Sequence, residues 1–397
     1  MQTVNIKFFY SKLHKQNEVD TIKNTILSFL SNYFKISDEQ SNVTIISVLT
    51  GGVEQDVIKF LSETELIPVI IVYHNSANSL PAVLEITTYL KELNRKVIPI
   101  HYENTRLLNK IVSVSSAVNS LKNSNIGIIG TPSDWLIAST VSEDYFNKTI
   151  KKLVTIQLSE IFQLFEQTDI KDTEKVYEKF SRFESYVDKT ELLKSLKMYV
   201  VLKKIIEKYN LNCFSIRCFD VLEKYRTTSC LALSLLNSEG IISGCEGDMQ
   251  SLMTMYITKL LTGKIPFMAN PSAADFIENK LTLAHCTCAI ELLNHKLLKI
   301  NTHFESNLGT AVQGSLKQGI YTLVKFGGKN MHRSFISRAR TIEHEWSGKL
   351  CRTQTVLSID EDLKKYISNP IGNHMVLLED DCTDILKLWY ELFIDTI

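Results

Sequence analysis

The stretch IPVIIVYHN, residues 67–75, decides the fold class of this chain of 397 residues. Its first seven residues form an apolar run, as expected of a parallel strand that helices cover on both faces. Strand-like runs recur before and after it, at residues 4–10, 43–49, 96–100 and 126–129. Helix-like segments separate these runs, at residues 20–34, 80–93 and 105–121. Strands that alternate with helices predict a doubly wound α/β lobe over residues 1–160.

The rest of the chain predicts two further domains. A helical stretch rich in Lys and Glu covers residues 147–209. Strand-like and helix-like segments then resume, and they predict a second doubly wound α/β lobe over residues 161–296. From about residue 297, short strand-like pieces separated by Gly and polar residues replace the long helices. These pieces predict a small C-terminal β-barrel over residues 297–397, closed by a helix. The predicted fold is therefore α/β, with two doubly wound α/β lobes followed by a small barrel.

Composition excludes several classes of protein. The 44 Lys and Arg residues balance the 44 Asp and Glu residues, whereas a general nucleic-acid binder needs a basic surface. The longest apolar run, at residues 66–73, is too short to span a bilayer, and no secretory signal precedes it. The eight cysteines show no C-x-x-C spacing, and none precedes residue 213. We therefore expect reduced, mostly buried thiols in a cytoplasmic protein, with neither nucleic acid nor membrane as a partner.

The densest polar cluster is GCEGD, residues 244–248, where a strand should end and a helix should begin. Ligands of open α/β sheets bind beyond the carboxyl ends of the strands. A carboxylate at such a point, from Glu246 or Asp248, could hold a divalent cation or transfer a proton. The alternative is a simple turn in which Asp248 caps the next helix.

Three other segments place polar side chains next to predicted strands. Asn270, in FMANPS at 267–272, precedes a proline, so it would present its amide where the strand ends; a plain turn is the alternative. His285, in AHCTC at 284–288, could ligate a metal or could be a core histidine, and the two neighbouring cysteines are expected in the core. His374 follows Gly372 and opens or precedes a strand.

The remaining candidates are weaker. His303 and Glu305 would share one face of a strand, unless they are a surface pair. Three motifs of the first lobe follow strands and would lie at the same edge of one parallel sheet, at residues 50–54, 73–75 and 130–135. With His74 and Trp135 among them, such a cleft suits a polyhydroxylated ligand, although each turn alone could be structural. No G-x-G-x-x-G or P-loop motif is present, so nucleotide binding has little support.

Several of these motifs together resemble the L-fucose isomerase-related family, whose superfamily includes the L-arabinose isomerases. The likeness is strongest from about residue 210 to residue 380, and the length of the chain resembles the compact branch of the family. It is carried by the run at 229–289, which contains GCEGD, FMANPS and AHCTC, and by four further motifs: GIIGTPSDWLIAS (127–139), HFESNLGTAVQG (303–314), CRTQ (351–354) and NPIGNHMVLLEDD (369–381).

The resemblance implies an aldose–ketose isomerase that assembles as a homotrimer or homohexamer and acts on a small-molecule sugar. In such enzymes an ion of the Mn²⁺ type, with Co²⁺, Mg²⁺ or Zn²⁺ as alternatives, holds the sugar while a carboxylate moves a proton through an enediol. By motif, Glu246 matches a metal-binding catalytic glutamate, and His285 and His374 match the histidine ligands. Ala269 and Asn270 stand where the family has a second carboxylate. Asn270 can ligate through its amide oxygen but cannot act as a base.

The resemblance also assigns supporting roles. Asp248 or Glu305 could supply the missing carboxylate, and His303 is a candidate for the acid/base relay that opens the sugar ring. Arg217, Arg352 and His303 could contact an acidic substituent of the sugar. The residues assigned to substrate binding are His74, Trp135, Arg217, Glu305 and Arg352, and His303 is assigned to catalysis. Two alternatives stay open: a catalytically inactive sugar-binding protein that keeps the isomerase fold, and another metal-assisted sugar enolisation, as in an epimerase or aldolase.

Overall fold

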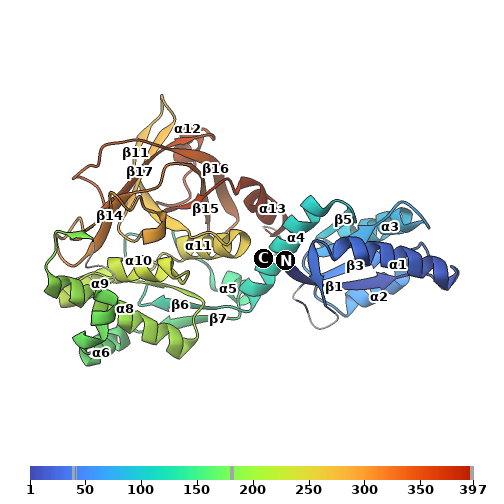
Figure 1. The fold of residues 1–397 in the computed structure, drawn as a ribbon, viewed down its shortest axis with the longest axis horizontal. Helices are drawn as coiled ribbons and strands as arrows, with labels where there is room; N and C mark the ends of the chain where they lie inside the picture. The colour runs from blue at the N-terminus through green and yellow to red at the C-terminus, as the bar shows by residue number, and fades with distance from the viewer. Residues whose placement is uncertain (38–40, 42, 179–182, 394–397) are drawn as a thin grey trace. The chain divides into compact units, whose positions relative to one another are not determined.

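The computed structural model describes residues 1–37, 41, 43–178 and 183–393. The chain divides into two compact units (Figure 1). One unit comprises residues 1–120 with the described residues from 391 onward, and the other comprises residues 121–390. The predicted limits between three domains, at 160/161 and 296/297, stay predictions. Among the described residues, no helix combines the length and the apolar character needed to cross a membrane.

The first unit is built on a parallel sheet with the strand order β2-β1-β3-β4-β5. Its strands are β1 (Gln2–Phe9), β2 (Phe34–Ile36), β3 (Thr44–Val48), β4 (Val69–Tyr73) and β5 (Val97–His101). Its helices are α1 (Gln16–Leu30), α2 (Glu54–Ser62), α3 (Ser79–Glu92) and most of α4 (Thr105–Lys122). The first four residues of β4 are fully buried, as the apolar run predicts, because both faces of a central parallel strand are covered. The α/β prediction is confirmed.

The second unit contains a four-stranded parallel sheet with the order β10-β9-β6-β7. Its strands are β6 (Asn125–Ile129), β7 (Lys152–Ile156), β9 (Cys213–Ile216) and β10 (Ile242–Gly244). The helices of this part are α5 (Glu143–Thr149), α6 (Leu158–Gln167), α7 (Glu174–Tyr177), α8 (Lys189–Tyr209), α9 (Cys218–Tyr225), α10 (Cys230–Ser238) and α11 (Met249–Thr262), with a short 3₁₀ turn η1 (Ile170–Thr173).

One prediction about this sheet is wrong. The motifs at 50–54, 73–75 and 130–135 do not share one sheet edge, because β6 bonds to β7 and β9 of the second sheet. The first two motifs follow β3 and β4 of the first sheet. The alternation of strands and helices gives the order of elements along the chain, but it does not show where one sheet stops and the next begins.

The C-terminal part is rich in strands, as predicted. Six antiparallel strands pair in a closed cycle, in the order β12-β11-β18-β15-β16-β17 and back to β12. They are β11 (Phe267–Asp275), β12 (Lys280–His285), β15 (Ile320–Gly327), β16 (Arg333–Ile342), β17 (Thr353–Ile359) and β18 (Met375–Glu379). Strand β17 also pairs with β14 (Ala311–Ser315), which continues through β13 (Lys299–Asn301) to β8 (Glu184–Ser185). The helices here are η2 (Ile290–Leu292), α12 (Leu363–Ser368) and α13 (Thr383–Phe393).

Helix α11 joins the two sheets of the second unit. It packs on β9 and β10 of the parallel sheet and on β11, β15 and β18 of the strand cycle, so that helices lie between two layers of strands (Figure 1). The loop from β10 into α11 contains the GCEGD motif. This motif therefore lies where the carboxyl edge of the parallel sheet meets the strand cycle.

Candidate metal centre

Three predicted metal ligands lie together in the second unit. Glu246 lies between β10 and α11, His285 is the last residue of β12, and His374 directly precedes β18. One ligand atom from each side chain lies within 4.8 Å of the others. The strand register explains this meeting, because Ala269 of β11 pairs with Met375 and Asn270 of β11 pairs with Ala284. His285 therefore ends β12 and His374 precedes β18, and both of these strands pair with β11.

The turn that carries Glu246 has an unusual backbone. Glu246 and Gly247 are consecutive residues with positive φ, at 62° and 68°. A glutamate pays a conformational penalty at such a φ, and residues held this way cluster at functional sites. The turn is fixed from the other side by Ser133, whose backbone N–H donates to the carbonyl of Glu246 at 2.9 Å. The backbone thus holds the Glu246 carboxylate in a defined position.

Gly247→Ala is expected to destabilise the fold by more than the same change at Gly263. Both glycines have nearly the same φ, at +68° and +69°, so the left-handed strain of about 1–2 kcal/mol is common to them. A Cβ at Gly247 would lie 2.6 Å from the carbonyl oxygen of Thr131, whereas one at Gly263 would meet nothing within 4 Å. Urea denaturation of the two variants measures the difference. Equal losses would show that the contact with Thr131 is relieved at no cost.

Asp248 is held by a buried network. It caps α11, accepting from the backbone N–H of Ser251 at 2.8 Å and from its hydroxyl at 2.7 Å. Nδ1 of His374 lies 2.8 Å from Oδ2 of Asp248, and Nζ of Lys325 lies 3.9 Å from the same oxygen. Burial alone would raise the pKa of Asp248, but Lys325 and His374 outweigh it and hold that pKa well below its usual range. The capping interpretation is confirmed, and the capping carboxylate also orients His374.

Among the residues that the structure describes, none hydrogen bonds to the second ring nitrogen of His374. Nε2 is buried, and its nearest ionic neighbour is Oε1 of Glu246 at 3.5 Å. When Nδ1–H donates to Asp248, the lone pair of the neutral ring is on Nε2, which is the arrangement that metal-binding histidines use. Burial alone lowers the pKa of His374, but its contacts with Asp248 and Glu246 raise it overall. A buried, unsatisfied Nε2 beside a carboxylate fits a metal ligand.

His285 and Glu246 supply the other two donors. Nδ1 of His285 is hydrogen bonded to the hydroxyl of Thr287 at 2.9 Å, and its ring meets that of His374 edge to face, 5.4 Å between centroids. Burial and the neighbouring His374 lower the pKa of His285 to about 4, so the ring is neutral near pH 7. Burial raises the pKa of Glu246, but His374, His285 and Trp135 outweigh it and lower that pKa. The group therefore offers one carboxylate and neutral imidazole nitrogen.

Trp135 lies beside Glu246, and its predicted role in substrate binding stays a prediction. Its indole N–H donates to Oε2 of Glu246 at 2.6 Å, while half of the side chain (52%) stays exposed. Trp135 meets Phe219 edge to face at 5.0 Å, and Phe219 meets His303 in the same way at 5.8 Å. A small pocket beside this row is lined by Cys218, Phe219, Leu222, Thr228, Ser229, Cys230 and His303. An aromatic row thus leads from the carboxylate to His303.

The prediction that His303 and Glu305 share one face of a strand is wrong. Strand β13 ends at Asn301, and His303 begins a tight turn in which its carbonyl accepts from the backbone N–H of Asn307 at 2.9 Å. His303 is buried and hydrogen bonded to Ser306, whereas Glu305 is exposed. The turn-forming residues after the strand override the alternation of side chains. The roles predicted for both residues stay predictions.

The two predicted arginines differ in their partners. Arg217 is paired with Asp134 at 2.9 Å and with Asp220 at 2.7 Å, so its guanidinium fixes the loop before Trp135. Arg352 is 8% exposed and donates twice to Thr302, at 2.7 and 3.1 Å. Within the part of the chain that the structure describes, no carboxylate forms an ion pair with Arg352. Its positive charge is thus buried without a neutralising partner.

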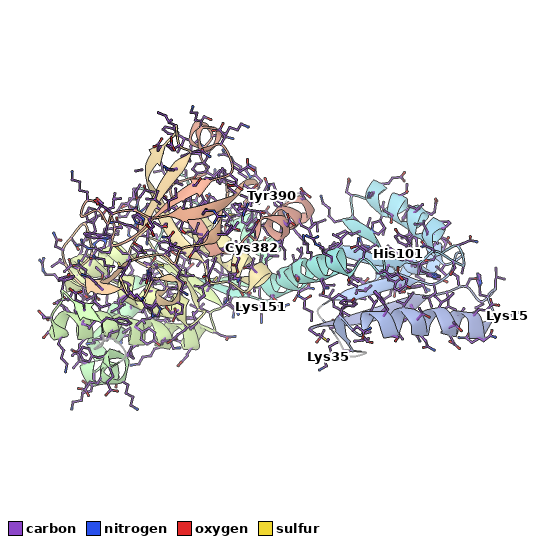
Figure 2. The ribbon with its side chains drawn as sticks, turned by 45° about the horizontal axis from the view of Figure 1, so that its top comes forward. Lys15, Lys35, His101, Lys151, Cys382 and Tyr390 are labelled. Atoms are coloured by element: carbon purple, nitrogen blue, oxygen red, sulfur yellow. The ribbon has the colours of Figure 1, made fainter. Side chains whose placement is uncertain are left out.

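Two further candidates are Asn270 and His74. Oδ1 of Asn270 accepts a hydrogen bond at 3.2 Å from Asn373, the neighbour of His374. His74 belongs to the first unit, where it is hydrogen bonded to the carbonyl of Leu49 and the hydroxyl of Ser76. It lines a pocket there with His101, which Figure 2 labels at the end of β5. The roles predicted for Asn270 and His74 stay predictions.

Sequence reasoning missed Lys325 and Phe219. Lys325 is fully buried in β15, whose sequence IYTLVKFG contains this one charge in an apolar run. A lysine in such a run is a detectable signal, because a lysine is almost never fully buried unless it is paired. Phe219 left no comparable signal, since an aromatic residue near the start of an amphipathic helix is ordinary core material.

Comparison with known proteins gives distant relatives, and no protein-family model matches the chain. Sulfoquinovose isomerase from Alkalicoccus urumqiensis is 24% identical over 232 residues, which cover 55% of this chain and 51% of that protein. Sulfoquinovose isomerase from Priestia aryabhattai is 22% identical over 296 residues, which cover 71% of this chain and 65% of that protein. The protein of the same name from Clostridium sp. (strain MSTE9) is 33% identical over 95 residues, 24% of this chain and 21% of that protein.

These matches are partial. The chain spans about half the length of the relative from Alkalicoccus urumqiensis (51%) and less than two thirds of the other two. All three relatives carry the same name, and two of the matches extend over more than half of this chain. The likenesses support an isomerase family for this chain.

Proposed function

We propose that this protein is a metal-dependent aldose–ketose isomerase, which moves a proton between C1 and C2 of a sugar through an enediol. The observation that supports this function best is the group of Glu246, His285 and His374, in which the buried Nε2 of His374 has no hydrogen-bond partner within the described part of the chain. The names of the distant relatives support the same class of reaction.

The donor set suits a divalent ion. One carboxylate and two imidazoles are ligands for Mn²⁺, and Co²⁺, Mg²⁺ or Zn²⁺ are alternatives. Glu246, His285 and His374 would hold the ion, and Asn270 is a candidate for a further ligand through its amide oxygen. When bound, such an ion supplies a Lewis acid that polarises the carbonyl of the sugar.

The side chains of the site divide the remaining work. Glu246 is ionised at neutral pH and is the carboxylate proposed to accept and return the proton. The indole N–H of Trp135 fixes its Oε2. Asp248 is fully engaged by Ser251, His374 and Lys325, which suits a role in holding His374. His303, at the far end of the aromatic row, is the proposed acid/base group for ring opening.

The proposed substrate is a sugar with an acidic substituent, such as the sulfonate of sulfoquinovose. The support comes from Arg352, whose guanidinium is buried and has no carboxylate partner among the described residues. A buried charge without a counter-ion is costly, and a guanidinium matches the oxygens of an anion. Thr302, which accepts both hydrogen bonds from Arg352, directly precedes His303. A homomeric assembly of three or six chains and a cytoplasmic location stay predictions.

The test is a sugar panel assayed in deuterated water with and without Mn²⁺. Sulfoquinovose is compared with D-glucose, which has the same ring without the sulfonate, and with L-fucose. Mn²⁺-dependent ketose formation with deuterium entering at C1 or C2 supports the enediol reaction. A protein that converts none of the sugars and binds no Mn²⁺ contradicts the proposal. Sugar binding without turnover favours a binding protein, and release of a shorter fragment favours an aldolase.

Arg352→Gln provides the substrate arm of the same test. Losing a charged hydrogen-bonding partner is expected to raise KM for sulfoquinovose by about 10–100-fold, since such bonds contribute about 1.5–3 kcal/mol. The KM for D-glucose, if it is converted, should stay unchanged. Equal activity of the wild-type protein on D-glucose and sulfoquinovose would contradict the acidic-substituent assignment.

Mn²⁺ affinity is expected to fall as the pH falls. His285 has a pKa of about 4 and the pKa of Glu246 is lowered, so both are ready donors above pH 5. The pKa of His374 is raised above 6.5, so a proton competes for its Nε2 in this range. Below the pKa of His374, Kd should rise by about tenfold per pH unit. Electron paramagnetic resonance titrations at pH 5.5, 6.5 and 8 measure this, and a constant Kd would exclude His374 as a ligand.

A further inference from the structure

Five of the eight cysteines gather near the metal centre, and the proposed reaction uses none of them. All eight are free thiols, and six are buried, as the sequence predicted. Cys230, Cys286 and Cys351 form one small apolar cluster. Cys218 and Cys245 form a separate pair whose Sγ atoms lie 3.1 Å apart.

The fold brings Cys218 and Cys245 together. They lie just beyond the carboxyl ends of β9 and β10, which are adjacent parallel strands with Ser215 opposite Gly244. Cys245 directly follows Gly244 and Cys218 lies three positions after Ser215, and the turns after the two strands bring the Sγ atoms to 3.1 Å. A disulfide has its sulfurs about 2.05 Å apart, so a shift of about 1 Å would convert this contact into a bond. The geometry therefore needs no rearrangement of either strand.

One of the two thiols lines a small pocket. Cys218 lines the pocket that also contains Phe219 and His303, whereas Cys245 is not among its lining residues; the exposed fractions of the two cysteines are 7% and 4%. Cys218 is thus the thiol expected to be oxidised first, and Cys245 is the thiol expected to form a disulfide with the oxidised Cys218.

We propose that Cys218 and Cys245 are an oxidative modification site that forms a disulfide when the protein meets a peroxide. The sulfur of Cys218 attacks the peroxide, the O–O bond breaks, and a sulfenic acid and one water form. The thiol of Cys245 then displaces the hydroxyl group, which leaves with the thiol proton as a second water. Two thiols lose two electrons in total, and hydrogen peroxide is reduced to two waters.

The disulfide would affect both the backbone that carries Glu246 and the loop that carries Trp135. Cys245 directly precedes Glu246, whose backbone already has a φ of 62°. Cys218 directly follows Arg217, which fixes the loop before Trp135 by its ion pair with Asp134. A shift of about 1 Å at the sulfurs therefore reaches both the carboxylate and its indole donor. This second part of the inference rests on the proposed metal-dependent function.

Peptide mapping tests the bond itself. Metal-free protein is treated with hydrogen peroxide, free thiols are alkylated, and peptides are compared by mass spectrometry before and after dithiothreitol. We expect a cross-linked pair of peptides containing Cys218 and Cys245, reversed by the reductant. Cys218→Ser should abolish the cross-link and leave Cys245 alkylated, while Cys288→Ser, at a buried thiol outside the pair, should keep it. Cys382, labelled in Figure 2 just before α13, should be alkylated in both states.

A second measurement tests the effect on the site. Oxidation is expected to raise the Kd for Mn²⁺ by about 10–100-fold, as losses around metal ligands commonly do. The Cys218→Ser variant, with its fold checked by circular dichroism, should show no such rise. Over-oxidation of Cys218 or Cys245 without a cross-link, or a cross-link between other cysteines, would overturn the inference. If reduced protein binds no Mn²⁺, the proposed function fails while the mass spectra still decide on the disulfide.

Discussion

Glu246→Gln is expected to lower kcat for sugar isomerisation by about 10²–10⁴-fold, the usual contribution of a general base. The amide keeps the size of the side chain and can still accept the hydrogen bond from Trp135. The amide cannot take up the proton from the sugar, and the substitution removes the one negatively charged metal ligand of the three-residue group. Steady-state kinetics with saturating Mn²⁺ should place most of the loss in kcat. A kcat within tenfold of the wild-type value would exclude Glu246 as the base.

Trp135→Phe is the matched control for this variant. Phenylalanine keeps an aromatic ring against Phe219 but removes the indole N–H that donates to Oε2 of Glu246. One neutral donor to a carboxylate contributes about 1.5–3 kcal/mol at most, so its loss should cost less than the loss of the carboxylate itself. An equal loss in both variants would mean that the position of Glu246, and not its basicity, limits the reaction.

Lys325→Met is expected to destabilise the protein by about 3–5 kcal/mol, the cost of removing one partner of a buried ion pair. Lys325 and Asp248 are both fully buried, and Lys325 also donates to the hydroxyl of Ser251 at 2.7 Å. Methionine fills a similar volume but leaves the carboxylate of Asp248 without its cation. Urea denaturation of metal-free protein measures the effect. A loss below about 1 kcal/mol would show that His374 alone compensates the charge of Asp248.

The double variant Lys325→Met with Asp248→Asn separates charge from packing. The amide oxygen of asparagine can still cap α11 at the Ser251 N–H, its NH₂ group then faces Nδ1 of His374 as a donor, and no buried carboxylate is left without its cation. The double variant should therefore be more stable than Lys325→Met alone. If it is less stable, the loss in the single variant comes from packing around β15 and not from the uncompensated carboxylate.

Local patterns in the sequence were sufficient to predict the α/β class, but they did not group the three residues of the candidate metal centre. Residues 68–72 of the apolar run are buried as predicted, because a covered parallel strand has no polar face. Resemblance to a family selected Glu246, His285 and His374 together. Spacing along the chain could not have done so, since the three residues lie at the ends of three different strands, β10, β12 and β18.

What the sequence could not show was pairing between distant segments. Strand β6 has the same apolar character as β4, yet it belongs to the other sheet, because hydrogen-bond partners are chosen by the whole fold. The same limit hid the partners of Lys325 and Asp248, which are 77 positions apart in the chain by their residue numbers, 325 and 248. The turn at His303 was missed for another reason, since alternation was assumed past the true end of β13.

The closed cycle of strands also constrains when the centre can exist during synthesis. His285 lies at the end of β12, which pairs with both β11 and β17, and His374 precedes β18, which pairs with β11 and β15. A nascent chain therefore cannot bring these two imidazoles to Glu246 until residue 374 has left the ribosome and β18 has joined β11 and β15. If the proposed function holds, an ion would be captured late in synthesis, and a chain that stalls before β18 would present Glu246 and His285 without their third partner.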